Sequence, residues 1–124
     1  MLRDFKLLPS ATLAAGSQSA GFQNEDPYSK GFGQFIVDVT AISGTLATLT
    51  ILIEGFDPTS GKYYTLLQSA GLTATGTTVL HLGPGLPATA NVSANAILTR
   101  NFRVRFTITG TTPSVTFSVG ASVA

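Results

Sequence analysis

The sequence contains no cysteine, no tryptophan and a single histidine, and these absences exclude several kinds of chemistry. Without cysteine the chain can form no disulfide, no thiolate metal site and no cysteine nucleophile. A histidine-based metal site would need carboxylates gathered from elsewhere, because His81 stands alone. Its neighbours Leu80 and Leu82 point to the opposite face of a predicted strand, so we interpret His81 as a structural or surface residue.

Charged residues are also scarce. Asp, Glu, Lys and Arg make up 10% of the 124 residues, against about 25% in ordinary globular domains, and the formal net charge is +1. The nearest approach to a basic patch is Arg103 with Arg105, so we expect no nucleic-acid partner. A surface of short uncharged side chains instead suits close packing against other proteins, because long charged side chains lose conformational entropy there.

Long hydrophobic runs are missing as well, although 44% of the residues are hydrophobic. No apolar run approaches the roughly 20 residues that a membrane-spanning helix needs. The N-terminal segment begins with basic residues and a short apolar stretch, but Asp4, Pro9 and Ser10 interrupt the pattern of a signal peptide. The sequence predicts neither a membrane partner nor a cleaved leader.

What the chain has in abundance is alternation of apolar and polar residues with period two, which is typical of strands that pack on one face. The alternation is clearest at 102–108 and 115–119 and recurs over 37–53. β-Branched residues are frequent there, and no segment carries an apolar stripe of helical spacing. Further strands are predicted at 62–69 and 77–83.

Two segments fall outside this pattern. Residues 1–31 lack sustained periodicity and are predicted to form an extended N-terminal arm, with room for short strands at 4–8 and near 13–22. Residues 83–96, GPGLPATANVSANA, are predicted to form a long surface loop, because two Pro and two Gly fit neither a strand nor a helix. The remainder, residues 32–124, is expected to be one β-sandwich domain that carries this loop.

Segments 37–53 and 104–119 repeat one another in pattern and in turn chemistry. With Ala41 omitted, Gly44 aligns with Gly110. Either any Thr-rich hairpin with a glycine turn looks this way, or the two segments are equivalent hairpins in facing sheets. Because each has one clean apolar face that needs covering, we favour the second interpretation. It predicts an all-β fold, an antiparallel two-sheet β-sandwich that is jelly-roll-like.

Two acidic residues, Asp38 and Glu54, lie on the polar faces of neighbouring predicted strands. A carboxylate pair of this kind could act as the acid and base of a glycosidase. Both could equally form ion pairs with Lys62, Arg103 or Arg105, and we favour this interpretation because charges on sheet surfaces commonly pair. We therefore predict no enzyme: no catalytic residue, no cofactor and no metal site.

Four stretches resemble a known group of proteins: VDVTAISGT (37–45), TLTILIEG (48–55), DPTSGK (57–62) and RVRFTITGTTPSVTFSV (103–119). In order and in turn chemistry they are similar to the small all-β virion proteins of tailed bacteriophages, of the capsid-decoration or head-associated type. The resemblance covers residues 32–119 and contains no catalytic signature.

The resemblance implies a non-enzymatic structural protein of a tailed-phage virion, assembled in the host cytoplasm. The role it favours is capsid decoration, with the protein attached to the head and stabilising it. The implied partners are the major capsid protein or other virion proteins, and further copies of the chain in a homo-oligomer. Two alternatives stay open. One is a host-surface or carbohydrate-binding fibre module, with a candidate site at loop 83–96, Tyr63, Tyr64 and His81. The other is a head–tail connector or tail ring subunit.

Overall fold

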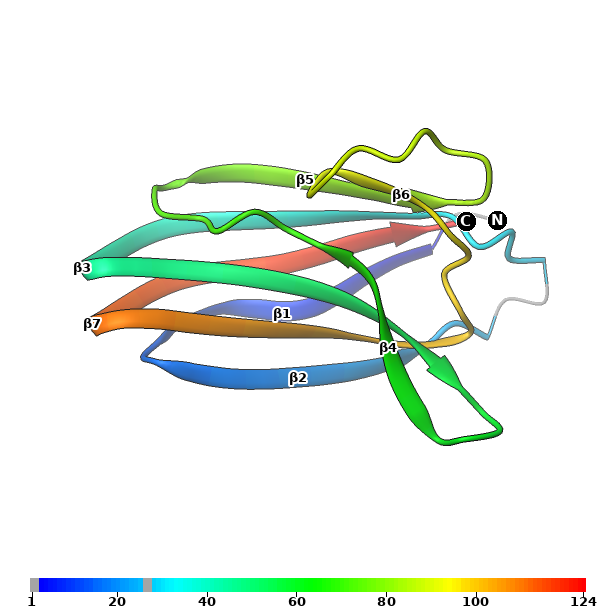
Figure 1. The fold of residues 1–124 in the computed structure, drawn as a ribbon, viewed down its shortest axis with the longest axis horizontal. Helices are drawn as coiled ribbons and strands as arrows, with labels where there is room; N and C mark the ends of the chain where they lie inside the picture. Colours follow the sequence, from blue (N-terminus) through cyan, green and yellow to red (C-terminus); the bar gives the residue numbers. More distant parts are fainter. Residues whose placement is uncertain (1–2, 26–27) are drawn as a thin grey trace.

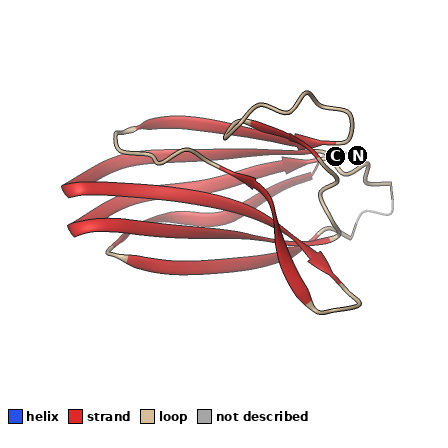
Figure 2. Ribbon diagram, in the orientation of Figure 1, coloured by secondary structure: helices blue, strands red, loops and turns tan. Residues whose placement is uncertain are grey.

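The structure, a computed structural model, describes residues 3–25 and 28–124, and every helix or strand in that part of the chain is a β-strand (Figure 1, Figure 2). The strands are β1 (Arg3–Leu13), β2 (Gly16–Gln23), β3 (Gly33–Asp57), β4 (Lys62–Gln68), β5 (Gly76–Gly83), β6 (Ser93–Asn95) and β7 (Asn101–Val123). The predicted all-β fold is confirmed. Within these residues no helix could span a membrane.

The two longest strands, β3 and β7, each fold back sharply at the left-hand end of Figure 1. Each corner contains two residues with positive φ. In β3 these are Gly44, at 112°, and Leu46, at 55°. In β7 they are Gly110, at 127°, and Thr112, at 45°. Each long strand is thereby divided into a first half before its corner and a second half after it.

Backbone pairing joins the halves of one long strand to those of the other. The first half of β3 pairs with the second half of β7, as in Phe35 opposite Ala121. The second half of β3 pairs with the first half of β7, as in Ile51 opposite Phe106. A single hydrogen-bonded sheet thus passes through both corners and folds into two facing layers (Figure 1).

The short strands complete the two layers. The first layer has the order β1, β7 second half, β3 first half, β5, and the second has the order β2, β7 first half, β3 second half, β4. These eight segments in two facing sheets have the arrangement of a jelly roll. The jelly-roll-like β-sandwich is therefore confirmed, with all pairs antiparallel except β5 with β6.

The expectation that 37–53 and 104–119 are hairpins in opposite sheets is wrong in one respect. Among the described residues no ladder joins the two halves of β3 to each other, or the two halves of β7. Each segment is a β-arch with one half in each layer. A hairpin and an arch show the same alternation of apolar and polar residues, because alternation reports which face is buried and not which strand is paired.

The core fills the space between the layers. Phe106 and Phe117, on opposite halves of β7, pack edge to face with ring centres 5.1 Å apart, and Phe35 packs on Phe102 at 6.2 Å. The large side chains with essentially no exposure are Phe35, Phe102, Phe117, Leu49, Ile51, Ile53, Leu80, Leu82, Ile108, Val37, Val104 and Val115. The buried face predicted for 102–108 is thus confirmed. Each such side chain contributes about 1.5–3 kcal/mol relative to an exposed one.

The predicted N-terminal arm is corrected by the structure, because residues 3–23 form β1 and β2 and pair along both halves of β7. Leu7 is buried, and the Phe5 ring packs edge-on to Phe102 at 5.9 Å. Both strands lie at sheet edges and bury few side chains, so their alternation is weak. Residues 1–2 and 26–27 of the predicted arm lie outside the described residues.

The predicted loop 83–96 is largely irregular, as expected, but it contains one strand. β6 pairs in parallel with the end of β5, placing Ser93 opposite His81. Polar side chains hold the loop together: the Ser93 hydroxyl donates to the carbonyl of Pro87 at 2.7 Å, and the Asn95 side-chain oxygen accepts from the Gly85 amide at 2.8 Å. Hydrogen bonds from Ser and Asn give this segment an order that its composition does not predict.

Candidate interaction surface

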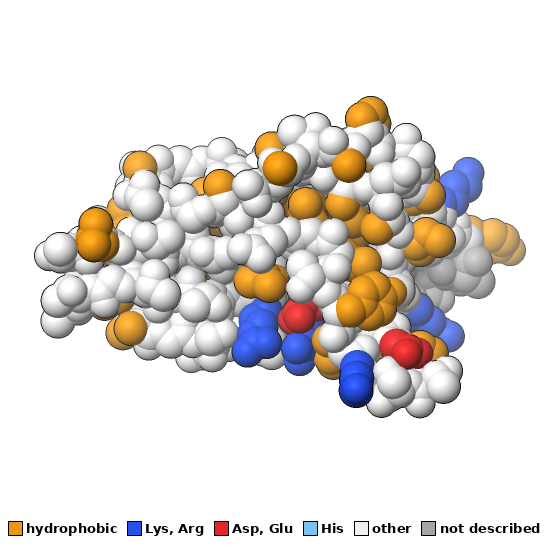
Figure 3. Space-filling model, viewed as in Figure 1, with side chains coloured by type: hydrophobic (Ala, Val, Ile, Leu, Met, Phe, Trp, Pro, Cys, Tyr) orange, Lys and Arg blue, Asp and Glu red, His pale blue; other side chains and the backbone are white. Residues whose placement is uncertain are grey.

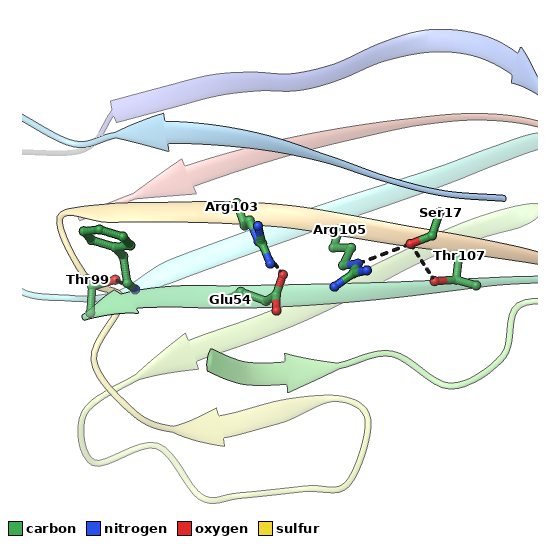
Figure 4. A network of polar contacts seen from close by, with 7 residues as sticks. Ser17, Glu54, Thr99, Arg103, Arg105 and Thr107 are labelled. Atoms are coloured by element: carbon green, nitrogen blue, oxygen red, sulfur yellow. Dashed lines mark hydrogen bonds and ion pairs between the residues drawn. The ribbon is translucent and has the colours of Figure 1, made fainter. Parts of the chain in front are cut away.

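The outer face of the second layer carries two separate groups of polar side chains, one around Glu54 and one around Ser17 (Figure 4). Glu54 comes from β3, Arg103 and Arg105 from β7, and Ser17 from β2. They face outward because their neighbours in each strand, such as Ile53 and Val104, point into the core. Figure 3 shows charged side chains over the lower and right-hand parts of the molecule and none at the left-hand end.

The central contact of this face is an ion pair. The Nε of Arg103 donates to Oε1 of Glu54 at 2.7 Å, and Glu54 is only 6% exposed. The Arg103 guanidinium also lies 4.0 Å from the centre of the Tyr63 ring, which packs on Phe56. The ion-pair interpretation of Glu54 is confirmed, with Arg103 as its partner. This buried ion pair stabilises the contact between β3 and β7.

Arg105, two residues further along β7, has a different environment. Its Nε donates to the Ser17 hydroxyl oxygen at 3.2 Å, and Thr107 lies 3.3 Å from the same oxygen. The described residues offer Arg105 no carboxylate within ion-pair distance. Its positive charge is therefore not neutralised by these residues and could contact another molecule. A single exposed guanidinium does not indicate which kind of ligand that would be.

Asp38 does not meet Glu54. Asp38 lies between Val37 and Val39, both buried, and so points outward from the first layer, where the Thr77 hydroxyl donates to it at 3.3 Å. Glu54 points outward from the second layer, and the core lies between them. The carboxylate-pair hypothesis is therefore wrong. In the described ranges no three His, Cys, Asp or Glu residues group as metal ligands would.

The candidate glycan site is not assembled either. A hollow does lie between β4 and loop 83–96, lined by residues 65–68, 88–91 and 93–96, but neither tyrosine nor His81 lines it. Tyr63 lines a hollow with Phe22 and Phe56 instead, and His81 lines another with Phe32 and Leu86. Tyr63 and Tyr64 are adjacent in β4 and so point to opposite faces.

The sequence reasoning missed β2 as part of the sheet. Its segment GSQSAGFQ is rich in small residues and lacks β-branched ones, so the short strand expected near 13–22 was assigned to an arm and not to the sheet. The only usable signal was the complete absence of charge from residues 7–24. β2 borders the polar face just described, since Ser17 bonds to Arg105.

Comparison with known proteins gives a likeness in fold. No protein-family model matches the chain, and no curated protein matches it. Among solved structures, a chain in the structure of infectious bursal disease virus, Gx strain, matches with a TM-score of 0.53 and 15% sequence identity. The match covers 99% of this chain and 31% of the viral chain. At this identity the likeness shows a shared fold, and this chain spans less than a third of its neighbour.

Proposed function

We propose that this protein is a non-enzymatic structural protein of a virus particle. The observation that carries the proposal is the likeness in fold, over 99% of the chain, to a chain in the structure of a virus. The scarcity of charged side chains supports it, because short uncharged side chains lose little entropy when they are packed against neighbouring subunits.

The finer role we propose is decoration of a tailed-phage head, with assembly in the host cytoplasm and the major capsid protein as partner. The resemblance of 37–45, 48–55, 57–62 and 103–119 to head-associated phage proteins supports this role. A bound decoration protein adds contact area between shell subunits and stabilises the assembled shell by mass action.

The end of the molecule that carries the two corners is the best candidate for contact with the shell. Segments 39–53 and 106–124, which supply both corners, contain no charged residue. Leu46 at the β3 corner is 85% exposed. Its φ is also positive, which is uncommon for a large apolar residue. Exposed apolar groups on an uncharged surface are typical of protein contact sites.

The test is co-sedimentation of the purified protein with capsids that lack it, combined with thermal inactivation of the capsids. Wild-type protein is expected to co-sediment and to raise the temperature of capsid disruption. Leu46→Asp is expected to weaken binding about tenfold or more, because it places a charge in an apolar contact. Ala88→Asp adds the same charge to an exposed loop position and serves as the matched control. Absence of wild-type binding would contradict the proposal.

A further inference from the structure

We propose that the free edge of β2 is a self-association site, where β2 of a second copy pairs antiparallel with it. The second layers of the two copies would then form one continuous sheet. This inference concerns the purified chain in solution and does not depend on the role in a virus particle.

The outer edge of β2 is open. β7 is the strand that pairs with β2 in the described chain, and the ladder runs unbroken from Gly16 opposite Ile108 to Gln23 opposite Asn101. In Figure 1, β2 runs along the lower left-hand side of the molecule, below β7. The other side of the strand therefore presents a straight row of backbone N–H and C=O groups, which is a template for another strand.

The other edges carry features that discourage pairing. β1 contains Lys6 and Pro9, and its ladder with β7 has two register shifts. β4 begins at Lys62, and its ladder is shifted once. β6 covers the end of β5 and leaves only 76–80 uncovered. Charge, proline, bulges and short length are the devices by which proteins protect sheet edges, and β2 has none of the first three.

The chemistry of β2 suits a second copy of itself. Its side chains are uncharged, so two copies bring no like charges together. Gln18 and Gln23 each donate and accept hydrogen bonds, so both can bond to polar groups of a neighbouring strand. Ser19 and Gly21 are small and exposed, so a second backbone can approach closely. Phe22 is only partly buried and would gain cover.

Symmetry restricts the register of such a pair. A two-fold axis perpendicular to the layer places inward-facing residues opposite inward-facing ones, because side chains alternate with period two. The registers that overlap the two strands most fully have Ser19 with Ser19 or Ala20 with Ala20 as the central pair. In both registers the two Ser19 side chains lie on the same face, opposite one another or as diagonal neighbours within about 8 Å.

The experiment is analytical ultracentrifugation of the full-length protein with charge variants at Ser19. Wild-type protein is expected to dimerise. Ser19→Glu and Ser19→Lys, each alone, are expected to weaken dimerisation about fivefold or more, since like charges then face one another. An equimolar mixture of the two variants is expected to restore a dimer. Gln68→Glu adds a charge to exposed β4 and should change nothing.

Arg105 lies opposite Ser19 on β7, so Ser19→Lys is expected to weaken dimerisation more than Ser19→Glu. Ser19 is exposed, so neither substitution buries a charge in the folded chain. Circular dichroism should therefore show an unchanged fold. A wild-type protein that stays monomeric at millimolar concentration would overturn the proposal. So would equal weakening by Gln68→Glu, or failure of the mixture to restore the dimer. Capsid binding is measured separately, so a failure here leaves the structural proposal standing.

Discussion

Arg103 performs three tasks from one position on β7. It neutralises Glu54, it covers that carboxylate from water, and it stacks on the Tyr63 ring of β4. The guanidinium suits this combination because it is planar and keeps its charge when partly buried. One side chain therefore connects three neighbouring strands of the second layer.

Replacing Arg103 by methionine should lower the free energy of unfolding by about 1–3 kcal/mol, because Glu54 would remain buried without its partner. Urea denaturation measures the loss. The double variant with Glu54→Gln should recover part of it, since no buried charge remains. Arg105→Met, at an exposed site on the same strand, should stay within about 0.5 kcal/mol of wild type. Equal losses at the two arginines would contradict this account.

Asp57 closes the turn between β3 and β4. The Ser60 hydroxyl donates to its carboxylate at 2.8 Å and the Thr59 amide at 2.9 Å, and these bonds hold the pKa of Asp57 below its ordinary value of 3.8. They favour the charged form in the folded state, so the stabilisation is complete above the ordinary pKa. It is lost as the pH falls through the lowered pKa.

Asp57→Asn should therefore be less stable than wild type at neutral pH, with a difference that shrinks on acidification below 3.8. Thermal unfolding of both proteins between pH 7 and about pH 2 measures this. A difference that stays constant over the whole range would show that the turn depends on the shape of the side chain and not on its charge.

Among the elements, the corners of β3 and β7 decide the topology. At Gly110 a Cβ would lie 2.9 Å from the carbonyl oxygen of Thr45, and at Gly44 one would lie 2.8 Å from the Cα of Pro113. The two corners therefore pack backbone against backbone. Only glycine allows this approach together with the positive φ that both positions adopt.

Gly110→Ala should lower the free energy of unfolding by about 1–3 kcal/mol more than Gly61→Ala does. Gly61 also has positive φ, at 73°, but a Cβ there would meet nothing within 4 Å. The comparison thus separates crowding from backbone strain, and urea denaturation measures both. Equal effects would mean that the corners are looser than the structure shows.

The sequence predicts the strands of the core well and their connections poorly. The faces of 102–108 and 115–119 alternate cleanly because both are covered on one side by the opposite layer. The arches were mistaken for hairpins because pairing between distant segments leaves no local pattern. The short strand expected near 13–22 was assigned to an arm, because an edge strand that is exposed at Ser17, Ser19 and Gly21 needs no apolar alternation.

The sequence predicts that Glu54 forms an ion pair, but it does not predict which residues of the candidate surface come together. Glu54 was expected to meet one of three cations, and the register that sets it opposite Arg103 selects one of them. That register depends on contacts across the whole fold. The division of Asp38 and Glu54 between two layers likewise follows from the β3 corner. The position of this corner is predicted correctly from the sequence, but it was expected to be a hairpin turn.

For the molecule as a whole, β1 and β2 are expected to be as necessary for folding as β7. β1 and β2 flank the two halves of β7, so their removal would open one side of both layers at once. Deletion of residues 1–23 should therefore abolish cooperative folding, measured by circular dichroism on heating. A truncated chain with an unchanged melting temperature would restore the arm interpretation.

The register that sets Arg3 opposite Val123 brings the beginning and the end of the fold together, away from the two corners (Figure 1). A reporter or antigen fused to either terminus would consequently emerge from the same pole of the molecule. The opposite pole, with Leu46 at its tip, would remain unobstructed in both fusions. The chain thus has the geometry of a one-sided display scaffold, in which cargo and attachment need not compete for space.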